Sequence, residues 1–345
     1  MSLPSDLPPS AQMLNLLWGK LISTSISGIA KLGVADHMTE REPASAEALA
    51  AATGAHASSL YRAMRMLASV GVFVELPGQR FTLTAVGRCL RSDVPDSMRG
   101  VAMFLTDTWH MRGYEKITHT LRTGQNGVET AFGKNPFEVM AENPAELENF
   151  QVGMSNYSAM EGPLLDPLLD FSGFRKIADV GGGHGSLLAR ILHRNPHLHG
   201  VLFDLPEVLT HAPSAASLDC QGRLTFESGN MFDRVPQGCD AYIMKHILHD
   251  WSDAHCHTIL RLICDQLARH APETGRVFVA EMIVPHGPDP HPAKFLDIEM
   301  LTMTAGGCER TQAEFAVMFE SAGLELVRAR PTAGPICLIE GRVAN

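Results

Sequence analysis

The sequence predicts an α/β protein in which a doubly wound, mostly parallel sheet follows an N-terminal, mainly helical domain. From Phe174 onward, short apolar runs alternate with runs of helical spacing, an order typical of parallel sheets covered by helices. At one junction, Asp179–Gly185, an apolar run passes through a glycine-rich turn into a helix-like run. Upstream of residue 100, helical spacing and a single hairpin pattern predict a smaller helical domain.

Length and composition narrow the class of protein. The 345 residues suffice for two domains, and 45% hydrophobic and 19% charged residues are ordinary for a globular enzyme. A formal net charge of −10 argues against a general nucleic-acid binder. The apolar runs are shorter than the ~18 residues needed to span a bilayer, and residues 1–9 lack the pattern of a signal peptide. The 7 cysteines form no C-x-x-C pair, so we expect a cytoplasmic protein with reduced thiols.

The N-terminal segment predicts a winged-helix module. After a Pro/Ser-rich arm at residues 1–10, apolar residues at 11–32 recur at helical spacing, as in a core helix or a dimer helix. The elements expected next are helices at 45–50 and 58–70 and hairpin strands at 72–76 and 80–83. The second of these helices carries Arg62 and Arg65 and little other positive charge, so packing or dimerisation is favoured there. A ligand-responsive DNA-binding regulator is the alternative from a different class.

The remaining chain divides into a helical segment and an alternating segment. Residues 97–165 look helical, with a loop expected at Gly124–Pro136 that carries Phe132. Strands are expected at 176–180, 199–203, 223–227, 239–244, 275–281 and 335–340. Helices are expected between them at 185–194, 206–210, 253–269 and 311–322.

The glycine turn indicates which ligand the C-terminal domain binds. Its spacing is G-x-G-x-G, whereas a dinucleotide fingerprint reads G-x-G-x-x-G. Asp179 lies two residues before the first of these glycines, and Asp204 ends the next apolar run. S-adenosylmethionine offers a cationic amino-acid end and a ribose to two such acids, whereas a diphosphate would be repelled by Asp179. A nicotinamide site and a tight turn without a ligand are alternatives that the turn leaves open.

Side chains that follow the other strands are expected at the same edge of the sheet. Asn230 and Met231 follow the third strand, where they could meet the edge and the face of an adenine. The run Lys245–Trp251 follows the fourth strand, and Glu281 ends the fifth. Because ligands of doubly wound sheets lie at the carboxyl ends of the strands, we expect these groups near the glycine turn.

Four ordered motifs resemble those of small-molecule O-methyltransferases, a family that includes plant caffeate and flavonoid enzymes and bacterial enzymes that methylate antibiotics and pigments. The motifs are Asp179–Gly185, Phe203–Pro206, His249–Asp253 and Gly306–Thr311, and the resemblance covers essentially the whole chain. It implies a Rossmann-like class I methyltransferase domain, an N-terminal winged-helix dimerisation domain and a homodimer. The expected boundaries are 1–100 for dimerisation, 101–165 for linking helices that contribute to the acceptor pocket, and 166–345 for the S-adenosylmethionine-binding catalytic domain.

The resemblance also implies roles for individual residues. His249 is implied as the general base, with Glu281 and Glu309 beside it. The residues implied to hold the cofactor are Asp179, Gly181, Gly183, Asp204, Leu205, Asn230, Met231, Lys245 and Ser158. The residues implied to approach the acceptor are Trp109, Phe132, Met154, Asp297, Met300 and Met303. The family usually has Asp where Asn230 stands, although an amide oxygen can still accept a hydrogen bond from the adenine amino group.

These residue types suit methyl transfer to an aromatic hydroxyl of a specialised metabolite. A phenol has a pKa near 10, so a histidine base close to the operating pH can remove its proton. A carboxylate on the other ring nitrogen would orient that base: Glu309 or Glu281, with Asp297 as third choice. No metal is expected, because the histidines within 246–257 match no familiar zinc spacing. N-methylation, a relative that does not transfer methyl groups, and the identity of the acceptor stay open.

Overall fold

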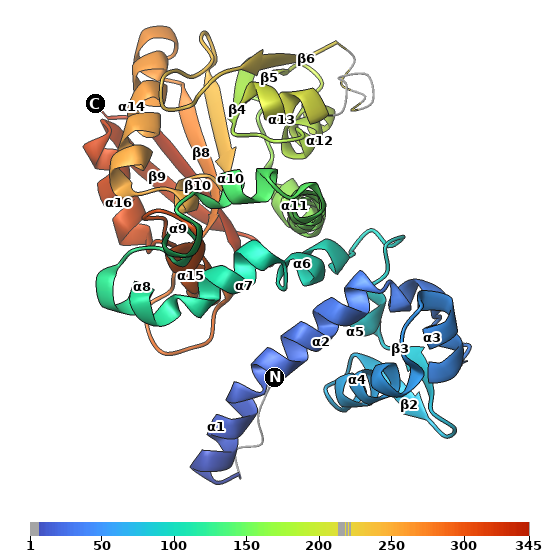
Figure 1. Ribbon diagram of the computed structural model, residues 1–345. Coiled ribbons are helices and arrows are strands. Elements are labelled where there is room, and N and C mark those ends of the chain that lie inside the picture. Colours follow the sequence, from blue (N-terminus) through green and yellow to red (C-terminus); the bar gives the residue numbers. More distant parts are fainter. Residues whose placement is uncertain (1–6, 213–217, 219, 221, 345) are drawn as a thin grey trace. The chain divides into compact units, whose positions relative to one another are not determined.

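The computed structural model describes residues 7–212, 218, 220 and 222–344, and the chain divides into two compact units. The first unit comprises Met1–Arg112 and Phe137–Ala159, and the second comprises Gly113–Pro136 and Met160–Asn345 (Figure 1). Most of the arm predicted at residues 1–10 lies outside the described residues, and its last two residues belong to a helix that begins at Pro9.

The first unit contains the predicted winged-helix module. Three strands form an antiparallel sheet in the order β1-β3-β2, and Ser45 begins the first helix by accepting a hydrogen bond from the Ala48 backbone N–H. Apolar side chains such as Met64 and Phe81 are fully buried between helices and sheet. The elements are η1 (Val34–His37), β1 (Ala44–Ser45), α3 (Ala46–Thr53), α4 (Ala57–Ser69), β2 (Phe73–Leu76), β3 (Arg80–Leu83) and α5 (Ala85–Arg88).

Helices precede and follow this module. The helix predicted at residues 11–32 is present as two, α1 (Pro9–Leu17) and α2 (Gly19–Lys31), and α1 buries no residue. The segment predicted to be helical after residue 97 consists of α6 (Arg99–Phe104), α7 (Thr108–Glu115), α8 (Ile117–Thr123), α9 (Gly127–Phe132), α10 (Pro136–Ala141) and α11 (Pro144–Leu165). The expected loop at Gly124–Pro136 is wrong in part, because Asn126 caps a short helix by accepting from the Glu129 N–H.

The second unit contains the predicted doubly wound sheet. Seven strands lie in the order β6-β5-β4-β7-β8-β10-β9, and all neighbours up to β8 are parallel. β10 is antiparallel to both of its neighbours, so the sheet is mixed at that edge. The strands are β4 (Lys176–Val180), β5 (His199–Asp204), β6 (Leu224–Ser228), β7 (Ala241–Lys245), β8 (Arg276–Met282), β9 (Leu324–Pro331) and β10 (Ile336–Val343).

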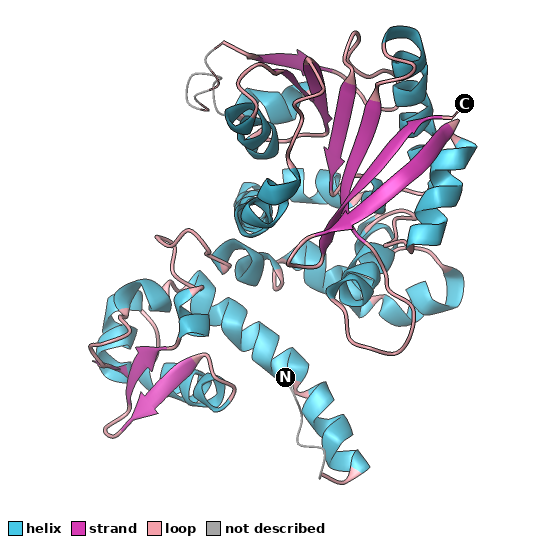
Figure 2. Cartoon of the chain, turned by 180° about the vertical axis from the view of Figure 1, so that it is seen from behind, coloured by secondary structure: helices cyan, strands magenta, loops and turns pink. Residues whose placement is uncertain are grey.

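Helices cover both faces of this sheet, as Figure 2 shows. One buried core joins α12 to the sheet through residues such as Leu188 and Ile191, and the other joins α14 and α16 through residues such as Ile263 and Phe315. These opposite cores are the physical basis of the predicted double winding. The helical elements are η2 (Asp166–Leu168), α12 (Ser186–Arg194), α13 (Pro206–His211), η3 (Leu248–Asp250), α14 (Asp253–His270), α15 (Pro292–Met303) and α16 (Gln312–Ser321).

Besides α9, the strand β9 and the helix α15 of the second unit were not expected from the sequence. β9 alternates apolar residues with charged ones, and as an edge strand it pairs only through β10. α15 begins directly after a Pro-rich segment, with Pro292 in its first turn, and α8 and α9 pack against it.

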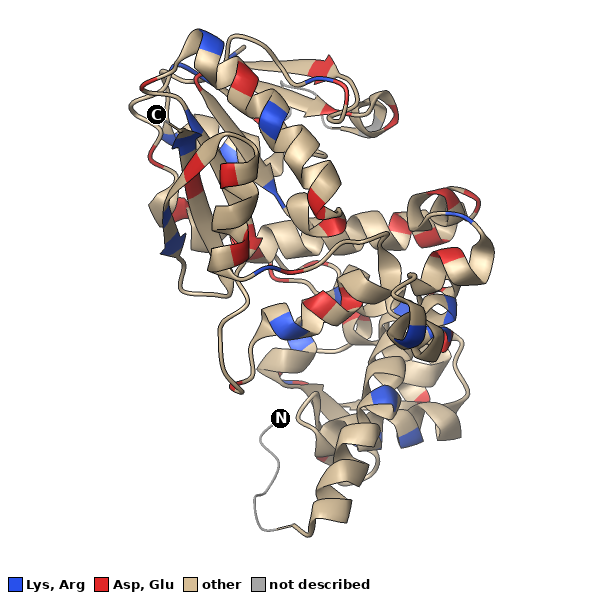
Figure 3. Cartoon of the chain, turned by 90° about the vertical axis from the view of Figure 1, so that its left-hand side faces the viewer, with Lys and Arg blue, Asp and Glu red and all other residues tan. Residues whose placement is uncertain are grey.

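Acidic and basic residues are mixed along the helices and strands (Figure 3). Within the described residues, none of the helices has the length and apolar character required to cross a membrane.

Candidate active site

The carboxyl ends of the central parallel strands bring the predicted motifs together. β4 leads into the glycine turn, β5 ends at Asp204, β7 ends at Lys245 and β8 contains Glu281 near its end. β4 lies between β5 and β7 in the sheet, and β8 follows β7. The sheet therefore places these motifs at one edge, as is usual for ligand sites of doubly wound folds.

Steric contacts explain why the turn after β4 consists of glycines. Gly181 has a φ of 72°, and a Cβ there would lie 2.5 Å from the Ile247 side chain. At Gly182 a Cβ would lie 2.4 Å from the Leu202 side chain and 2.6 Å from the carboxyl carbon of Asp179. The Gly181 N–H also donates to the Phe203 carbonyl oxygen at 2.8 Å. Side chains therefore do not fit at Gly181 and Gly182, whereas at Gly183 a φ of 57° favours glycine although the space around it is open.

The two predicted acids of the glycine turn lie in different environments. Asp204 accepts hydrogen bonds from the backbone N–H groups of Gly183 at 2.8 Å and Leu205 at 2.7 Å. Asp179 is 2% exposed, and its Oδ2 has no hydrogen-bond partner among the described residues. Burial and the charge of Asp204 raise the pKa of Asp179 to about 7, although Lys245 opposes the shift. A buried carboxylate with one oxygen unpartnered would be stabilised in its charged form by a cationic ligand group.

The other predicted cofactor residues divide between the two units. Asn230 is exposed and its Oδ1 accepts from the Phe232 N–H at 3.0 Å, while Met231 packs partly against the core. Lys245 donates from Nζ to Glu161 at 3.1 Å. Ser158 lies on the part of α11 that belongs to the first unit.

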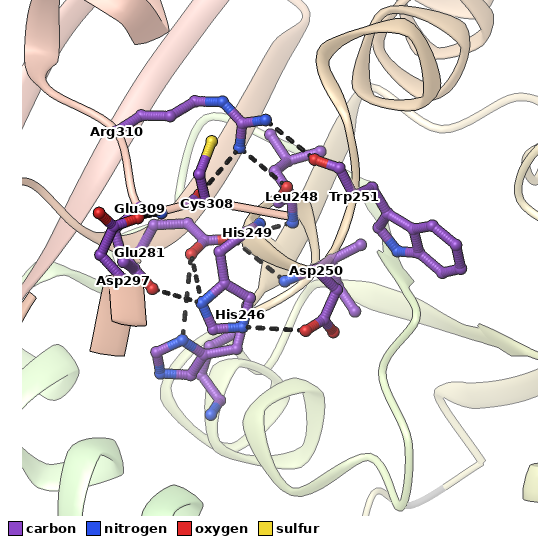
Figure 4. A network of polar contacts seen from close by, with 12 residues as sticks. His246, Leu248, His249, Asp250, Trp251, Glu281, Asp297, Cys308, Glu309 and Arg310 are labelled. Carbon is purple, nitrogen blue, oxygen red and sulfur yellow. Dashed lines mark hydrogen bonds and ion pairs between the residues drawn. The ribbon is translucent and has the colours of Figure 1, made fainter. Parts of the chain in front are cut away.

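His249 lies in the 3-10 turn η3, which directly follows β7. Its Nδ1 is 2.7 Å from Glu309 Oε1 and 3.5 Å from Glu281 Oε2 (Figure 4). Its Nε2 is 3.7 Å from Asp250 Oδ1. The side chain is buried, so a carboxylate holds one ring nitrogen and defines the orientation of the other.

The three carboxylates proposed as orienters have different contacts. Glu309 is the one that hydrogen-bonds to the His249 ring. Glu281 uses Oε1 to accept from the backbone N–H groups of Ile247 at 3.1 Å and Leu248 at 2.9 Å, which fixes the turn that carries His249. Asp297 accepts from the Glu309 backbone N–H at 2.9 Å and so fixes the position of Glu309.

A buried arginine joins the two segments that meet at His249. Arg310 donates to the carbonyl oxygens of Leu248 and Trp251, each at 2.9 Å, and to Asp253 Oδ1 at 2.8 Å. These acceptors lie on both sides of His249 in the sequence, and Arg310 directly follows Glu309 (Figure 4). The Arg310 side chain therefore fixes the loop of the base relative to the loop of its carboxylate.

The protonation of His249 differs from the sequence-based expectation of a base near the operating pH. Burial favours the neutral ring, but the carboxylates of Glu281, Asp250 and Glu309 outweigh burial and raise the pKa of His249 to about 10. The sequence could not show the raised pKa of His249, because Glu281 and Glu309 are 32 and 60 residues away in the chain and only the fold brings them to the ring.

The six predicted acceptor residues also divide between the units. In the second unit, Met300 and Met303 of α15 are buried, Phe132 ends α9, and Asp297 supports Glu309. In the first unit, Trp109 is 2% exposed and packs among Phe104, His110 and Phe150, while Met154 of α11 is exposed. Their contacts with an acceptor stay a prediction.

Two residues that sequence reasoning gave no role lie beside His249. The His246 ring stacks on the His249 ring, with centroids 4.9 Å apart, and its Nε2 is 2.8 Å from Glu161 Oε1. His246 belongs to the run Lys245–Trp251 that follows the fourth predicted strand, so its position could have raised the question. Nothing in the sequence connects Glu161 of α11 with a strand 80 residues away.

His246, His249 and Glu281 are close enough for metal binding, with potential ligand atoms within 4.8 Å of one another. His249 Nδ1 and His246 Nε2 are each within hydrogen-bond distance of a carboxylate, at 2.7 Å and 2.8 Å. Such contacts are those of protonated imidazole nitrogens. We therefore interpret the group as sharing protons, and the chemistry considered below needs no metal.

The doubly wound sheet, the glycine turn and the two acids at its strand ends define a class I methyltransferase domain. The O-methyltransferase domain family matches residues 114–325, and the O-methyltransferase dimerisation domain family matches residues 14–93. The chain belongs to the family of S-adenosylmethionine-dependent O-methyltransferases, and S-adenosylmethionine is its cofactor. The fold class predicted from the sequence is thereby confirmed.

Similar proteins share almost the full length of the chain. The phenazine O-methyltransferase of Lysobacter antibioticus is 34% identical over 337 residues, which cover 97% of each chain. The mitomycin biosynthesis 6-O-methyltransferase of Streptomyces lavendulae is 34% identical over 336 residues, 96% of this chain and 93% of the relative. The 8-amino-8-demethylriboflavin N,N-dimethyltransferase of Streptomyces davaonensis is 31% identical over 317 residues, 91% of this chain and 90% of the relative.

Solved structures show the same architecture with bound ligands. A methyltransferase of calicheamicin biosynthesis, bound to S-adenosylhomocysteine, matches with a TM-score of 0.86 and 33% identity, covering 98% of this chain and 100% of the other. An O-methyltransferase from neocarzinostatin biosynthesis, in complex with S-adenosylmethionine and 2-hydroxy-5-methyl naphthoic acid, matches with a TM-score of 0.75 and 29% identity, covering 93% of this chain and 95% of the other.

Proposed function

We propose that this enzyme transfers the methyl group of S-adenosylmethionine to a phenolic or other aromatic hydroxyl of a small specialised metabolite, with His249 as general base. The observation that carries the proposal is the 2.7 Å contact between His249 Nδ1 and Glu309 Oε1, because it leaves the opposite ring nitrogen, Nε2, to accept a proton. Relatives that act on phenazine and mitomycin, and a neighbour bound to a naphthoic acid, support an aromatic acceptor.

The residues at the strand ends suit the cofactor. The unpartnered Oδ2 of Asp179 would compensate a cationic group of S-adenosylmethionine, and the carboxylate of Asp204 retains lone pairs for ribose hydroxyls. The tight glycine turn allows close approach of the backbone to the ligand. We assign cofactor binding to Asp179, Gly181, Gly183, Asp204, Leu205, Asn230, Met231, Lys245 and Ser158.

The proposed mechanism rests on proton removal and alignment. Bound S-adenosylmethionine supplies an electrophilic methyl group on its sulfonium. His249 Nε2 accepts the hydroxyl proton of the acceptor, and Glu309 stabilises the imidazolium through Nδ1. Because the pKa of His249, about 10, is close to that of a phenol, the proton transfer is nearly balanced. Glu281 and Arg310 keep the base in place while the oxygen attacks in line with the methyl carbon and the leaving sulfur.

A second candidate is methylation of an aromatic amine, which one relative favours by its name as an N,N-dimethyltransferase. The experiment that separates the candidates is incubation of the enzyme with methyl-labelled S-adenosylmethionine and a host metabolite extract. Mass spectrometry with fragmentation then locates the label on oxygen or nitrogen. Label on an aromatic hydroxyl supports the proposal, whereas label on nitrogen alone or no labelled product overturns it.

Cofactor affinity is expected to increase with pH through about 7. Burial and Asp204 raise the pKa of Asp179 to about 7, so this acid is mostly neutral below that pH and becomes available to a cationic ligand group above it. The expected change is at most about tenfold in Kd per pH unit below the pKa, with a plateau above it. Calorimetric titration with S-adenosylhomocysteine from pH 5.5 to 8.5 measures it. Asp179→Asn is the control and should give a nearly pH-independent Kd; equal slopes in both proteins would contradict the assignment.

We infer that the enzyme is a homodimer joined through its N-terminal domain. The dimerisation family matches residues 14–93, and α1 exposes apolar side chains to solvent. We retain residues 1–100 as the dimerisation domain, 101–165 as linking helices and 166–345 as the catalytic domain. All 7 cysteines are free, which fits the cytoplasmic location expected from the sequence.

Charges on α1 are expected to convert the dimer to a monomer. Leu16 and Leu17 are 64% and 65% exposed in the single chain, so the monomer should fold with glutamates at these positions. In an apolar interface the two glutamates would be buried as charges, which should prevent dimer formation. The double variant Leu16→Glu with Leu17→Glu is compared with wild type by size-exclusion chromatography with light scattering. Val317→Glu, at a 66% exposed apolar position on α16, is the matched control. A double variant that stays dimeric would exclude α1 from the interface.

A further inference from the structure

His246 is held in an unusual position beside the base. Its φ is 53°, in the left-handed region that a residue with a large side chain adopts infrequently. From this backbone its ring reaches Glu161, with Nε2 2.8 Å and 2.9 Å from the two carboxylate oxygens. The same ring lies nearly parallel to the His249 ring, at an interplanar angle of 27°. Strained backbone conformations are found mainly at functional sites, so the position of the His246 ring against the His249 ring suggests a role for His246 in this site.

The two imidazoles face a single oxygen of Glu281. Glu281 Oε1 is occupied by backbone N–H groups of η3 and the residue before it, whereas Oε2 has no hydrogen-bond partner among the described residues. Oε2 lies 3.5 Å from His249 Nδ1 and 4.0 Å from His246 Nδ1 (Figure 4). His246 Nδ1 is likewise buried, and none of the residues that the structure describes forms a hydrogen bond with it. The remaining charge of Glu281 is thus available to either histidine.

Several charged side chains surround His246. The titratable groups that face it come from every element packed against it: Glu161 of α11, Lys245 of β7, His249 and Asp250 of η3, Glu281 of β8 and Glu309 of the loop after α15. Four of these groups are carboxylates, and the only ammonium among them is Lys245. Burial would raise the pKa of Glu161, but His246 and Lys245 outweigh it and lower the pKa to about 2, so Glu161 stays charged.

We propose that His246, held by Glu161, competes with His249 for the free oxygen of Glu281 and thereby makes the base easier to deprotonate. His246 is then a positioning residue, because it acts through His249 and touches neither cofactor nor acceptor in this role. Any interaction of Glu281 Oε2 with His246 Nδ1 withdraws a share of the Glu281 charge from His249, and that charge is one of those that hold a proton on the His249 ring. The inference rests on the proposed function only for its effect on catalysis, since the competition itself is a property of the ground state.

The test uses a replacement that removes the imidazole and tolerates the backbone. Asparagine adopts positive φ more readily than most residues, so His246→Asn avoids much of the strain. The midpoint of the His249 imidazole titration is measured by NMR on the dimeric enzyme, with the signal assigned from a His249→Gln spectrum. In His246→Asn the midpoint is expected to rise by about one pH unit. His270→Asn, an exposed position at the end of α14, is the control and should leave it unchanged.

A lysine variant distinguishes an electrostatic effect of residue 246 on the pKa of His249 from an effect of lost side-chain packing. His246→Lys places a hydrogen-bond donor near Glu161 and Glu281 again and is expected to return the His249 midpoint toward its wild-type value. His246→Gln is the second neutral replacement if the asparagine variant does not fold, as judged by its binding of S-adenosylhomocysteine. An unchanged or lowered midpoint in the neutral variants overturns the inference. If the midpoint rises but the pH dependence of kcat/KM does not follow, the tuning stands and the assignment of His249 as base is wrong.

Discussion

His249→Ala is expected to lower kcat by ~10²–10⁴ while leaving the Kd of S-adenosylhomocysteine nearly unchanged. The loss follows from the role of the ring, because alanine provides no acceptor for the hydroxyl proton and leaves Glu309 buried without its partner. Cofactor affinity should persist, since the glycine turn and Asp204 keep their contacts. Single-turnover kinetics with the identified acceptor, together with calorimetry, measure both quantities.

The pH dependence provides a further check on this prediction. In the wild-type enzyme kcat/KM should increase about tenfold per pH unit toward pH 10, because carboxylates keep His249 protonated below its pKa of about 10. The His249→Ala enzyme should lose the part of this dependence that is due to the base. His270→Ala, at an exposed position, is the matched control and should behave as wild type. Turnover of His249→Ala within a few fold of wild type would remove the base assignment.

Asp204→Ala is expected to weaken S-adenosylhomocysteine binding by roughly 10- to 100-fold. Hydrogen bonds to a charged acceptor contribute about 1.5–3 kcal/mol, and this carboxylate also holds the Gly183 and Leu205 N–H groups that shape the turn. At saturating cofactor, kcat should fall much less than affinity. Calorimetry for Kd and steady-state kinetics for kcat separate the two effects.

A graded series makes the Asp204 result specific. Asp204→Asn keeps one acceptor oxygen without the charge, so its Kd should lie between those of wild type and Asp204→Ala. Asp289→Ala, at an exposed acid in a loop, controls for the change in net charge and should leave the Kd unchanged. Wild-type affinity in Asp204→Ala would exclude the ribose role.

The sequence predicted the elements whose patterns are local. Six of the strands of the large sheet and the winged-helix module followed from alternating apolar runs, turn glycines and caps such as Ser45. β9 was not predicted because its charged residues are typical of an edge strand and hide the strand pattern. α9 was not predicted because its short sequence between Asn126 and Gly133 resembles a loop. In these segments pairing and packing by distant residues outweigh the local signal.

The candidate site shows the same division. The glycine spacing and the strand ends pointed to Asp179 and Asp204, whereas the role predicted for His249 came from the resemblance to O-methyltransferases. The choice among Glu309, Glu281 and Asp297 could not be made from the sequence. It depends on contacts between residues 12 to 60 positions apart in the chain: Glu309 with the His249 ring, Glu281 with the turn that carries it, and Asp297 with Glu309.

The sequence by itself determined the fold class and the glycine turn, because these depend on local steric and periodic patterns, and its resemblance to O-methyltransferases predicted the role of His249. Only the tertiary structure decided the protonation of that histidine. Four carboxylates, from Glu161, Asp250, Glu281 and Glu309, gather around two stacked imidazoles, and their charges act through a buried region in which water screens them little. A pKa depends on three-dimensional distances and burial, and neither can be read from the order of residues.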